Sequence, residues 1–428
     1  MSELLTPKLR FPKFDDNWST HNLSEISEQI KRKKEDISSE DNILTISANK
    51  GFISQKERWD NVIAGGSLKK YTYLKQNEFS YNRGNSKSFK FGCIYKLNNY
   101  KNALVPNVYH SFKITYGNTD FFEQLFKSKI LDKQLIKMIT STARMDGLLN
   151  ISAKNFFNIN VNFPNDLKEQ EKIGSFLKTI DTKIILLEQK YDNYLNFKKY
   201  LMQQIFTQKL RFDFDEEWNN DTIGNNSEVF GRIGFRGYTV DDLVNKGEGA
   251  LTIGGKHISK DYQLDLSDPE YLSWEKYEES PEIKIYNNDV LLVKTASVGK
   301  VCFIENLNEP ATLNPQLIVF KNIKLNNKFF YYYLTSNLFQ KDIHKIKSTT
   351  GIPTITQKEL LNLNIIYPSL EEQEKIVNLL SIVDKKIFAI DKNIQDIKEF
   401  KKGLLQQMFN NVRLVVINLI INEYICPL

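Results

Sequence analysis

The sequence predicts an α+β protein that is built twice, in the order domain, helix, domain, helix. The first observation is a duplication: the stretch Phe163 to Phe206 returns as Tyr367 to Phe409, and from Glu169 onward the copies align without a gap, 203 residues apart. The second is the residue pattern of the segments before each copy. They contain short apolar or aromatic runs separated by glycine and asparagine, as strands of a mixed domain do.

Both copies carry an apolar residue at alternating steps of four and three. This seven-residue repeat is typical of a coiled coil, because a period of about 3.5 residues keeps one stripe of a helix facing a partner helix. Lys198 and Lys401 interrupt the stripe at matching positions, and a basic residue at a core position fixes register or partner choice. The predicted seam residues are Ile173, Leu177, Ile180, Ile184, Leu187, Tyr191, Tyr194, Leu201 and Ile205, then Ile376, Leu380, Val383, Ile387, Ile390, Ile394, Ile397, Leu404 and Met408.

Length and composition bound the protein class. A chain of 428 residues is too long for one ordinary core and favours two or more domains. A hydrophobic content of 41% and a charged content of 26% indicate a soluble protein, and a net charge of +6 is compatible with nucleic-acid binding without requiring it. Three widely spaced cysteines and an N-terminus without a signal-peptide core predict a cytoplasmic protein with no disulfides and no membrane partner.

The repeat extends beyond the helices. A leader, Lys8 to Phe11, followed by an aromatic residue, acids and Trp18, returns as Lys209 to Phe212 before Trp218. Phe163-Pro164 and Tyr367-Pro368 deliver the chain into the long helices, since proline just inside a helical pattern signals a helix start. The predicted segments are a first domain with its leader (1–162), a first helix (163–208), a second domain (209–366), a second helix (367–410) and a C-terminal tail (411–428).

Within the two domains the halves diverge. A helix is expected from Glu25 to Ile37, where the basic run Lys31 to Lys34 is either a solvated face or a DNA contact. The segment Ala103 to Lys113 corresponds to Ala311 to Lys321. Strands are expected at Leu44–Ile46, Tyr71–Leu74, Lys90–Leu97, Ala250–Ile253, Val290–Lys294, Val301–Ile304 and Leu317–Lys321.

We find no catalytic or metal-binding pattern in the sequence. Gly299-Lys300 lacks the earlier glycine and the following hydroxyl of a phosphate-binding loop. Asn314-Pro315-Gln316-Leu317 resembles the base-gripping loop of amino-methyltransferases but lacks its second proline and its aromatic residue. The four histidines are isolated, so we expect no metal and no cofactor in this chain.

Two polar loops in equivalent places have the chemistry of DNA binding. The loop from Ser80 to Ser88 corresponds to the loop from Lys294 to Lys300. Arginine and lysine pair with guanine edges, asparagine pairs with adenine, and hydroxyls or lysines bind phosphate. The alternative is an ordinary polar loop. The candidate DNA-binding residues are Lys50, Lys56, Arg58, Lys69, Lys70, Tyr81, Asn82, Arg83, Asn85, Lys87 and Arg144 in the first domain, and Arg232, Arg236, Lys256, Lys294, Thr295, Ser297, Lys300, Lys345 and Lys347 in the second.

The pattern resembles the specificity subunit of type I restriction–modification enzymes over nearly the whole chain. The resemblance rests on aromatic-Pro followed by Glu-Gln-x-x-Ile, on the helix after it and on a closing Gln-Gln-x-Phe. Each occurs twice, after a variable domain. The matching residues are Pro164, Glu169, Gln170, Ile173, Gln203, Gln204 and Phe206, and in the second copy Pro368, Glu372, Gln373, Ile376, Gln406, Gln407 and Phe409.

The resemblance implies an architecture and a function. Two mixed α/β target recognition domains would each read one half of a split, asymmetric site in double-stranded DNA. They would be separated by the two long helices, paired as an antiparallel coiled coil in a pseudo-twofold internal repeat. Two modification subunits that carry S-adenosylmethionine would dock on the chain, restriction subunits would join them, and the chain itself would be non-catalytic.

Two other functions stay open at this point. An interaction scaffold that uses its helices alone would show no salt-sensitive DNA binding. A stand-alone nuclease or methyltransferase would show activity as the purified chain.

Overall fold

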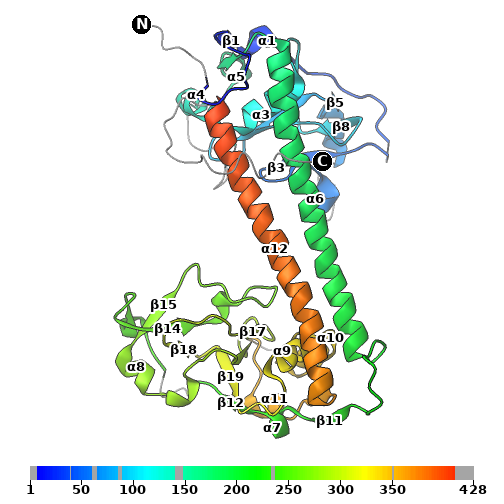
Figure 1. Cartoon of the computed structure of the whole chain (residues 1–428). Helices are drawn as coiled ribbons and strands as arrows, with labels where there is room; N and C mark the ends of the chain where they lie inside the picture. The colour runs from blue at the N-terminus through cyan, green and yellow to red at the C-terminus, as the bar shows by residue number, and fades with distance from the viewer. Residues whose placement is uncertain are drawn as a thin grey trace. The chain divides into compact units, whose positions relative to one another are not determined.

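The computed structural model describes residues 7–38, 40–59, 65–84, 89–139, 148–232, 237–348 and 351–409. These residues form two compact units. Unit 1 contains the described residues up to Glu188 and those from Lys392 onward, and unit 2 is Gln189–Asp391. Both units are mixed α/β, and each includes one part of each long helix, α6 and α12, drawn in green and in orange to red in Figure 1.

Unit 1 is built from short strands around one larger sheet. That sheet has the order β2-β9-β6-β7, and the pairs β1-β10, β3-β4 and β5-β8 form separate two-stranded ladders. Its strands are β1 (Ser19–Asn22), β2 (Ser27–Gln29), β3 (Leu44–Ser47), β4 (Gly51–Ser54), β5 (Thr72–Lys75), β6 (Phe79–Asn82), β7 (Cys93–Lys96), β8 (Asn102–Val105), β9 (His110–Ile114) and β10 (Asn160–Phe163). Its shorter helices are α1 (Leu23–Ile26), α2 (Gln55–Trp59), η1 (Gly65–Lys70), α3 (Thr119–Lys127), α4 (Asp132–Met138) and α5 (Ala153–Phe157).

Unit 2 repeats this plan with one larger additional sheet. The sheet β12-β19-β16-β17 corresponds to the main sheet of unit 1, β11-β20 corresponds to β1-β10, and β13-β15-β14-β18 is a second four-stranded sheet. Its strands are β11 (Asn219–Thr222), β12 (Glu228–Phe230), β13 (Leu243–Val244), β14 (Gly249–Ile253), β15 (Glu270–Ser273), β16 (Val290–Val293), β17 (Val301–Phe303), β18 (Ala311–Leu313), β19 (Leu317–Lys321) and β20 (Asn364–Tyr367). Its shorter helices are α7 (Ile223–Asn226), η3 (Val240–Asp242), η4 (Gly255–His257), α8 (Trp274–Glu278), η5 (Pro281–Ile283), α9 (Asn327–Thr335), α10 (Asn337–Ile346) and α11 (Gln357–Leu361).

Every strand predicted from the sequence coincides with a strand of the structure, but the helix expected from Glu25 to Ile37 is wrong. Only Leu23–Ile26 is helical, and Ser27–Gln29 joins the main sheet as its edge strand. Pairing with β9 supplies backbone hydrogen bonds that outweigh local helix propensity. The basic run is largely engaged within unit 1: Arg32 donates two hydrogen bonds to the carboxylate of Glu78, at 2.7 and 2.8 Å, and Lys34 pairs with Asp41.

The long helices α6 (Leu167–Phe206) and α12 (Leu370–Phe409) are each 40 residues long, about 60 Å at 1.5 Å per residue. Pro164 and Pro368 lie before the first helical residue, not inside it. The starts are instead capped by side chains: Asp166 accepts a hydrogen bond from the Lys168 amide at 2.8 Å, and Ser369 stands in the matching place before α12. All the predicted seam residues are buried or half-buried.

The duplicated Glu-Gln pair has a structural role that no sequence pattern predicts. The buried Glu169 carboxylate accepts hydrogen bonds from Arg10 Nε and Nη2 at 2.6 and 2.7 Å, and so ties the leader to the start of α6. Gln170 accepts a hydrogen bond from the Asn118 amide at 2.8 Å and donates one to the Pro164 carbonyl at 2.8 Å. The adjacent Glu and Gln side chains therefore hold three segments together by hydrogen bonds: the leader, the loop before α3 and the start of the long helix.

Unit 2 repeats these contacts. Arg211 donates to the buried Glu372 carboxylate at 2.8 and 3.2 Å. Gln373 accepts from the Asn326 amide at 2.9 Å and donates to the Pro368 carbonyl at 2.9 Å.

The two leaders reach equivalent places by different routes. In unit 2 the leader follows α6 directly, and the Leu210 amide donates to the Gln204 carbonyl at 3.1 Å. In unit 1 the leader comes from the start of the chain, and the Leu9 amide donates to the Gln407 carbonyl of α12, also at 3.1 Å. Phe409, the last residue of α12, packs in the core of unit 1 against Trp18 and Phe121.

The two interrupting lysines make matching ion pairs, one in each unit. Within unit 1, Lys401 of α12 pairs with Asp181 of α6, and within unit 2, Lys198 of α6 pairs with Asp384 of α12 at 2.6 Å. Both the lysines and the aspartates are related by the 203-residue repeat. In each unit, therefore, a lysine of one long helix meets an aspartate of the other.

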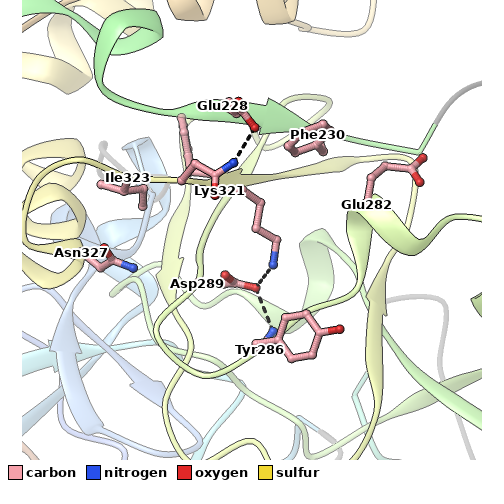
Figure 2. A pocket seen from close by; sticks show the side chains of 10 residues that line it. Glu228, Phe230, Glu282, Tyr286, Asp289, Lys321, Ile323 and Asn327 are labelled. Carbon is pink, nitrogen blue, oxygen red and sulfur yellow. Dashed lines mark hydrogen bonds and ion pairs between the residues drawn. The ribbon is translucent and has the colours of Figure 1, made fainter.

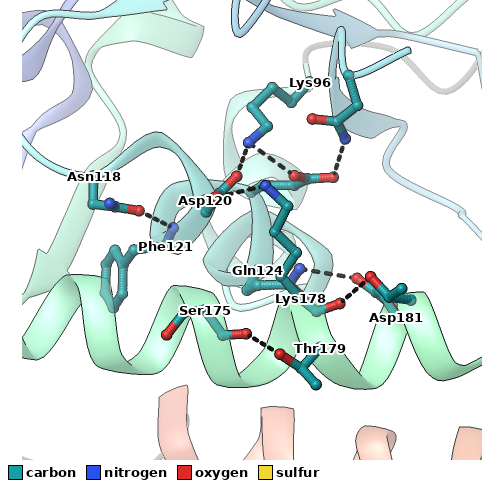
Figure 3. A network of polar contacts seen from close by, with 12 residues as sticks. Lys96, Asn118, Asp120, Phe121, Gln124, Ser175, Lys178, Thr179 and Asp181 are labelled. Carbon is teal, nitrogen blue, oxygen red and sulfur yellow. Dashed lines mark hydrogen bonds and ion pairs between the residues drawn. The ribbon is translucent and has the colours of Figure 1, made fainter.

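The surroundings of the two aspartates differ. Asp181 belongs to the polar network of Figure 3, where it accepts from Gln124 Nε2 at 2.9 Å and also pairs with Lys127 at 3.2 Å. Burial alone would raise the pKa of the Asp181 carboxyl, but Lys127 and Lys401 together lower that pKa below its ordinary value. Asp384 accepts instead from the Tyr332 hydroxyl at 2.8 Å.

Candidate nucleic-acid interface

Arg83 and Lys294 occupy equivalent positions at the ends of two central strands. Arg83 follows β6 and Lys294 follows β16, and each strand pairs with the strand that enters from a turn, β9 or β19. The carbonyl of Arg83 accepts a hydrogen bond from the Leu149 amide at 2.9 Å, and the carbonyl of Lys294 accepts one from Ile355 at 3.0 Å. The predicted correspondence between the two loops therefore has a shared backbone geometry.

The side chain of Arg83 is partly occupied within unit 1. Its Nε donates to the Val108 carbonyl at 3.0 Å, and its Nη1 lies 3.5 Å from the Ile151 carbonyl. The neighbouring Asn82 accepts from the Gly84 amide at 2.9 Å, which bends the loop after β6. Both residues shape the loop.

Lys294 is the most available cation of the second loop. Its side chain is half-buried, and among the described residues no hydrogen-bond or ion-pair partner meets its ammonium group. Burial lowers its pKa below the ordinary lysine value, because a charge is less stable where water is partly excluded. An anionic or acceptor-rich ligand would supply the missing partner.

The rest of this loop is held by its neighbours. The hydroxyls of Thr295 and Thr354 lie 3.3 Å apart, and Lys300 donates to the Ile258 carbonyl at 2.7 Å. Ser297 is exposed. Ala296 adopts a left-handed conformation with φ of 66°, and its amide donates to the Pro353 carbonyl at 2.9 Å. The loop is thus preorganised, with Lys294 and Ser297 as its accessible polar groups.

Two candidate residues are core residues, so their predicted DNA contact is corrected. Tyr81 has 0% exposure, stacks on Phe156 with ring centroids 4.6 Å apart and donates its hydroxyl hydrogen to the Phe91 carbonyl. Arg232 is 3% exposed and donates to the Leu313 carbonyl at 3.1 Å. Burial lowers the Arg232 pKa, yet guanidinium stays charged in proteins, so this side chain acts as a buried clamp.

The remaining candidates are scattered. In unit 1, Lys50, Lys56, Arg58, Lys69 and Lys70 are exposed, and Arg58 also donates to the Ile46 carbonyl at 3.1 Å. In unit 2, Lys256 pairs with Asp268 and Glu270, Lys345 pairs with Asp342, and Lys347 is half-buried at the end of α10. Asn85, Lys87, Arg144 and Arg236 lie outside the described residues.

Two turns beside the loops were not among the candidates. They join β8 to β9 and β18 to β19, and they carry Val108 and Gln316 at their exposed third positions. The correspondence of Ala103–Lys113 with Ala311–Lys321 was the sequence signal that could have drawn attention to them.

A pocket elsewhere in unit 2 is a poor site for phosphate. Figure 2 shows Glu228, Glu282 and Asp289 among its lining side chains, around a cavity of about 450 Å³. Its one lysine, Lys321, is already paired with Asp289. Because carboxylates dominate the lining, phosphate groups would be repelled.

Metal and membrane chemistry find no support in the part of the chain that the structure describes. No group of three or more His, Cys, Asp or Glu residues there could hold a metal ion. No helix among those residues is long and apolar enough to cross a membrane.

The fold and the loops define a class: a protein with two related mixed α/β units, each with a basic residue at an equivalent strand end. A family model described as the type I restriction modification DNA specificity domain matches residues 239–399. The type I restriction enzyme MjaVIII specificity subunit of Methanocaldococcus jannaschii is 25% identical over 297 residues, which cover 66% of this chain and 68% of the relative. The putative type I specificity subunit S.MpnORF365P of Mycoplasma pneumoniae is 24% identical over 255 residues, 58% of this chain and 82% of the relative.

Solved structures share the fold. The S subunit of a type I restriction–modification system from M. genitalium aligns with a TM-score of 0.60 at 15% identity, over 95% of this chain and 100% of its own. A chain in a solved structure that addresses complex assembly and conformational transition of the type I restriction–modification system aligns with a TM-score of 0.54 at 15% identity. The alignment covers 93% of this chain and 99% of the other. The chain is thus similar in sequence to specificity subunits of type I restriction–modification systems, and it shares the fold of solved S subunits.

Proposed function

We propose that this chain is the non-catalytic subunit that selects the DNA sequence for a type I restriction–modification complex. Each unit's α/β domain binds one half of a bipartite, asymmetric site in double-stranded DNA. The observation that carries the proposal is the matched pair of loops after β6 and β16. The same backbone geometry presents Arg83 in one unit and Lys294 in the other. Equivalent loops with different side chains suit two half-sites of different sequence.

The long helices act as the spacer between the half-sites and as the docking surface for two modification subunits. The proposal that α6 and α12 pair antiparallel is supported by the two matching ion pairs, Lys401 with Asp181 and Lys198 with Asp384. An antiparallel pair equates the start of each helix with the end of the other, as a repeat with twofold pseudo-symmetry requires. The modification subunits supply S-adenosylmethionine and the methyl transfer, and restriction subunits complete the complex.

The primary experiment maps methylation. The chain is expressed with its cognate modification subunits, and the methylated motif is read from the host DNA. We expect a split sequence with two unlike halves. Methylation without regard to a split sequence would overturn the proposal.

The spacer role has its own test. Insertion of seven residues into α6 and seven at the matching place in α12 keeps the seam in register and lengthens each helix by about 10 Å. We expect a longer preferred spacer with both half-sequences unchanged. An unchanged spacer would remove this role from the helices.

An interaction scaffold is the second candidate function, favoured only by the length of the helices. Salt distinguishes it from a DNA reader, because a protein that contacts phosphates binds DNA more weakly as salt rises. Affinity of the assembled complex for its mapped site, measured between 50 and 200 mM salt, should fall steeply.

A further inference from the structure

Two β-turns, one in each unit, present an exposed third residue beside the proposed DNA-binding loops. In unit 1 the Tyr109 amide donates to the Pro106 carbonyl at 3.1 Å, and in unit 2 the Leu317 amide donates to the Asn314 carbonyl at 3.2 Å. The third residue of the first turn is Val108, and that of the second is Gln316. Both turns lead into the strand next to the one that ends at the loop.

Strand register sets each of these residues opposite the basic residue of the loop. Tyr81 pairs with His110 in unit 1, so two residues further Arg83 lies opposite Val108. Val293 pairs with Leu317 in unit 2, so Lys294 lies opposite Gln316, and the Lys294 amide donates to the Gln316 carbonyl at 2.8 Å. Directly opposite residues of antiparallel strands have Cβ atoms about 5 Å apart. A ligand held by the loop cation therefore lies within reach of the turn residue.

The two turn residues have opposite chemistry. Val108 leaves 38% of its surface in solvent although it is apolar, and the Arg83 guanidinium holds its carbonyl. Part of this methyl-bearing surface therefore stays open to a ligand. The apolar feature that DNA offers in its major groove is the 5-methyl group of thymine.

Gln316 is held so that it presents donors. Its Oε1 accepts hydrogen bonds from the Gly255 amide at 3.3 Å and from Asn314 Nδ2 at 3.4 Å. Because the Gly255 N–H requires an acceptor, the amide oxygen must face inward and the NH₂ group outward. The NH₂ group of Gln316 and the ammonium group of Lys294, the residue opposite it in the strand register, are two donors, and guanine offers the two acceptors O6 and N7. Adenine would set its own N6 donor against them.

We propose that Val108 and Gln316 are the specificity-determining residues of the two half-sites, with Val108 against a thymine methyl group and Gln316, beside Lys294, donating to a guanine. This inference rests on the proposed function and assigns bases to it. Arg83 is then a positioning residue for the first turn, since its contact with the Val108 carbonyl fixes where the valine side chain stands.

The valine arm of the test uses binding of the assembled complex to duplexes that carry the mapped motif. Each thymine of the first half-site is replaced in turn by uracil, which lacks only the methyl group. At one position we expect affinity to fall about fourfold, the value of one buried methyl group at about 0.8 kcal/mol. The Val108→Ala complex already lacks the contact with the methyl group, so its affinity should be the same for thymine and uracil at that position. If Val108→Ala responds to every uracil as the parent does, the assignment of Val108 is overturned.

The glutamine arm uses Gln316→Glu, which keeps the shape and the inward oxygen but replaces the outward donors with an acceptor. Affinity for the native second half-site should fall about 5- to 150-fold, the range of a good base contact. Replacement of one guanine by 7-deazaguanine should weaken the parent complex and leave Gln316→Glu unaffected. An unchanged second half-site preference in Gln316→Glu would overturn the assignment of Gln316.

The unaltered half-site serves as the internal control in both arms, since each variant should change one half only. The parent complex tests the proposed function separately from the assignment of the turn residues. If it methylates no split sequence, the proposed function fails. If it does so while both variants retain the parental base preference, only the assignment of the turn residues fails.

Discussion

The matched lysine–aspartate pairs of the long helices should contribute unequally to stability. Replacement of Lys401 by Met leaves Asp181 with the cation Lys127 at 3.2 Å and the amide of Gln124 at 2.9 Å. Replacement of Lys198 by Met leaves Asp384 with the neutral hydroxyl of Tyr332. Lys198→Met therefore leaves the Asp384 carboxylate without a compensating positive charge, whereas Lys401→Met does not do this to Asp181.

The magnitudes follow from burial. The lysine side chains are 9% exposed at Lys401 and 16% at Lys198, and both aspartates are 26% exposed, so solvent screens part of each interaction. Exposed pairs are worth about 0.2–1 kcal/mol, and breaking a buried pair costs about 3–5 kcal/mol. We expect about 2 kcal/mol for Lys198→Met in unit 2. For Lys401→Met in unit 1 we expect about 1 kcal/mol, because Lys127 remains and because burial already disfavours the charged form of Lys401, lowering its pKa.

Native-state hydrogen exchange measured on peptides from each unit would give the two free energies separately. Lys198→Arg, which keeps the charge, is the matched control, and Lys198→Met combined with Asp384→Asn should recover part of the loss. A Lys401→Met variant that costs as much as Lys198→Met, or variants that loosen both units equally, would refute this reasoning.

Three further outcomes are expected. Lys294→Ala should weaken binding of the second half-site alone by about 1–3 kcal/mol, whereas Arg83→Ala should impair the first half-site and also loosen its turn, as binding and exchange would show. Burial lowers the pKa of Lys294 in the free protein and a DNA partner would raise it, so affinity should decline as pH rises through the free-state pKa. Lys294→Arg, charged at all these pH values, should lose this pH dependence in the same binding assay. Arg10→Met should destabilise unit 1 by about 3 kcal/mol in urea unfolding, because it leaves the buried Glu169 carboxylate without its cation, and Arg211→Met should do the same in unit 2.

Local periodicity explains why much of the fold was predictable. The spacing of apolar residues from Ile173 to Ile205, and in the second copy, predicts the long helices. Short apolar runs between glycine and asparagine residues predict the strands. The helix expected from Glu25 failed because its residues satisfy their backbone by pairing with β9, which is more than 80 residues away in the sequence. No local pattern reports such a partner.

Individual side chains of the interface were harder to assign. Tyr81 lies among polar residues in the sequence. It stands two positions after Phe79 in β6, however, so both side chains point to the same face of the sheet and are buried in the core. Arg232 is charged and was expected at the surface, but the carbonyl groups of Leu313 in β18 and Lys276 in α8, both distant in the sequence, accept its hydrogen bonds. The partners that distinguish Arg83 from Lys294 likewise come from segments far along the chain.

The seating of Phe409 and Gln407 in unit 1 has a consequence for synthesis of the protein. Unit 2 is a continuous stretch and is complete once Asp391 has left the ribosome, but unit 1 lacks part of its core until Leu404, Met408 and Phe409 emerge. At about 5–20 residues per second, the first domain waits roughly 10–40 s with this apolar surface uncovered. The domain that is translated first is therefore the last to be finished, and it is the one that a premature stop codon or a stalled ribosome would leave open to aggregation or to chaperones.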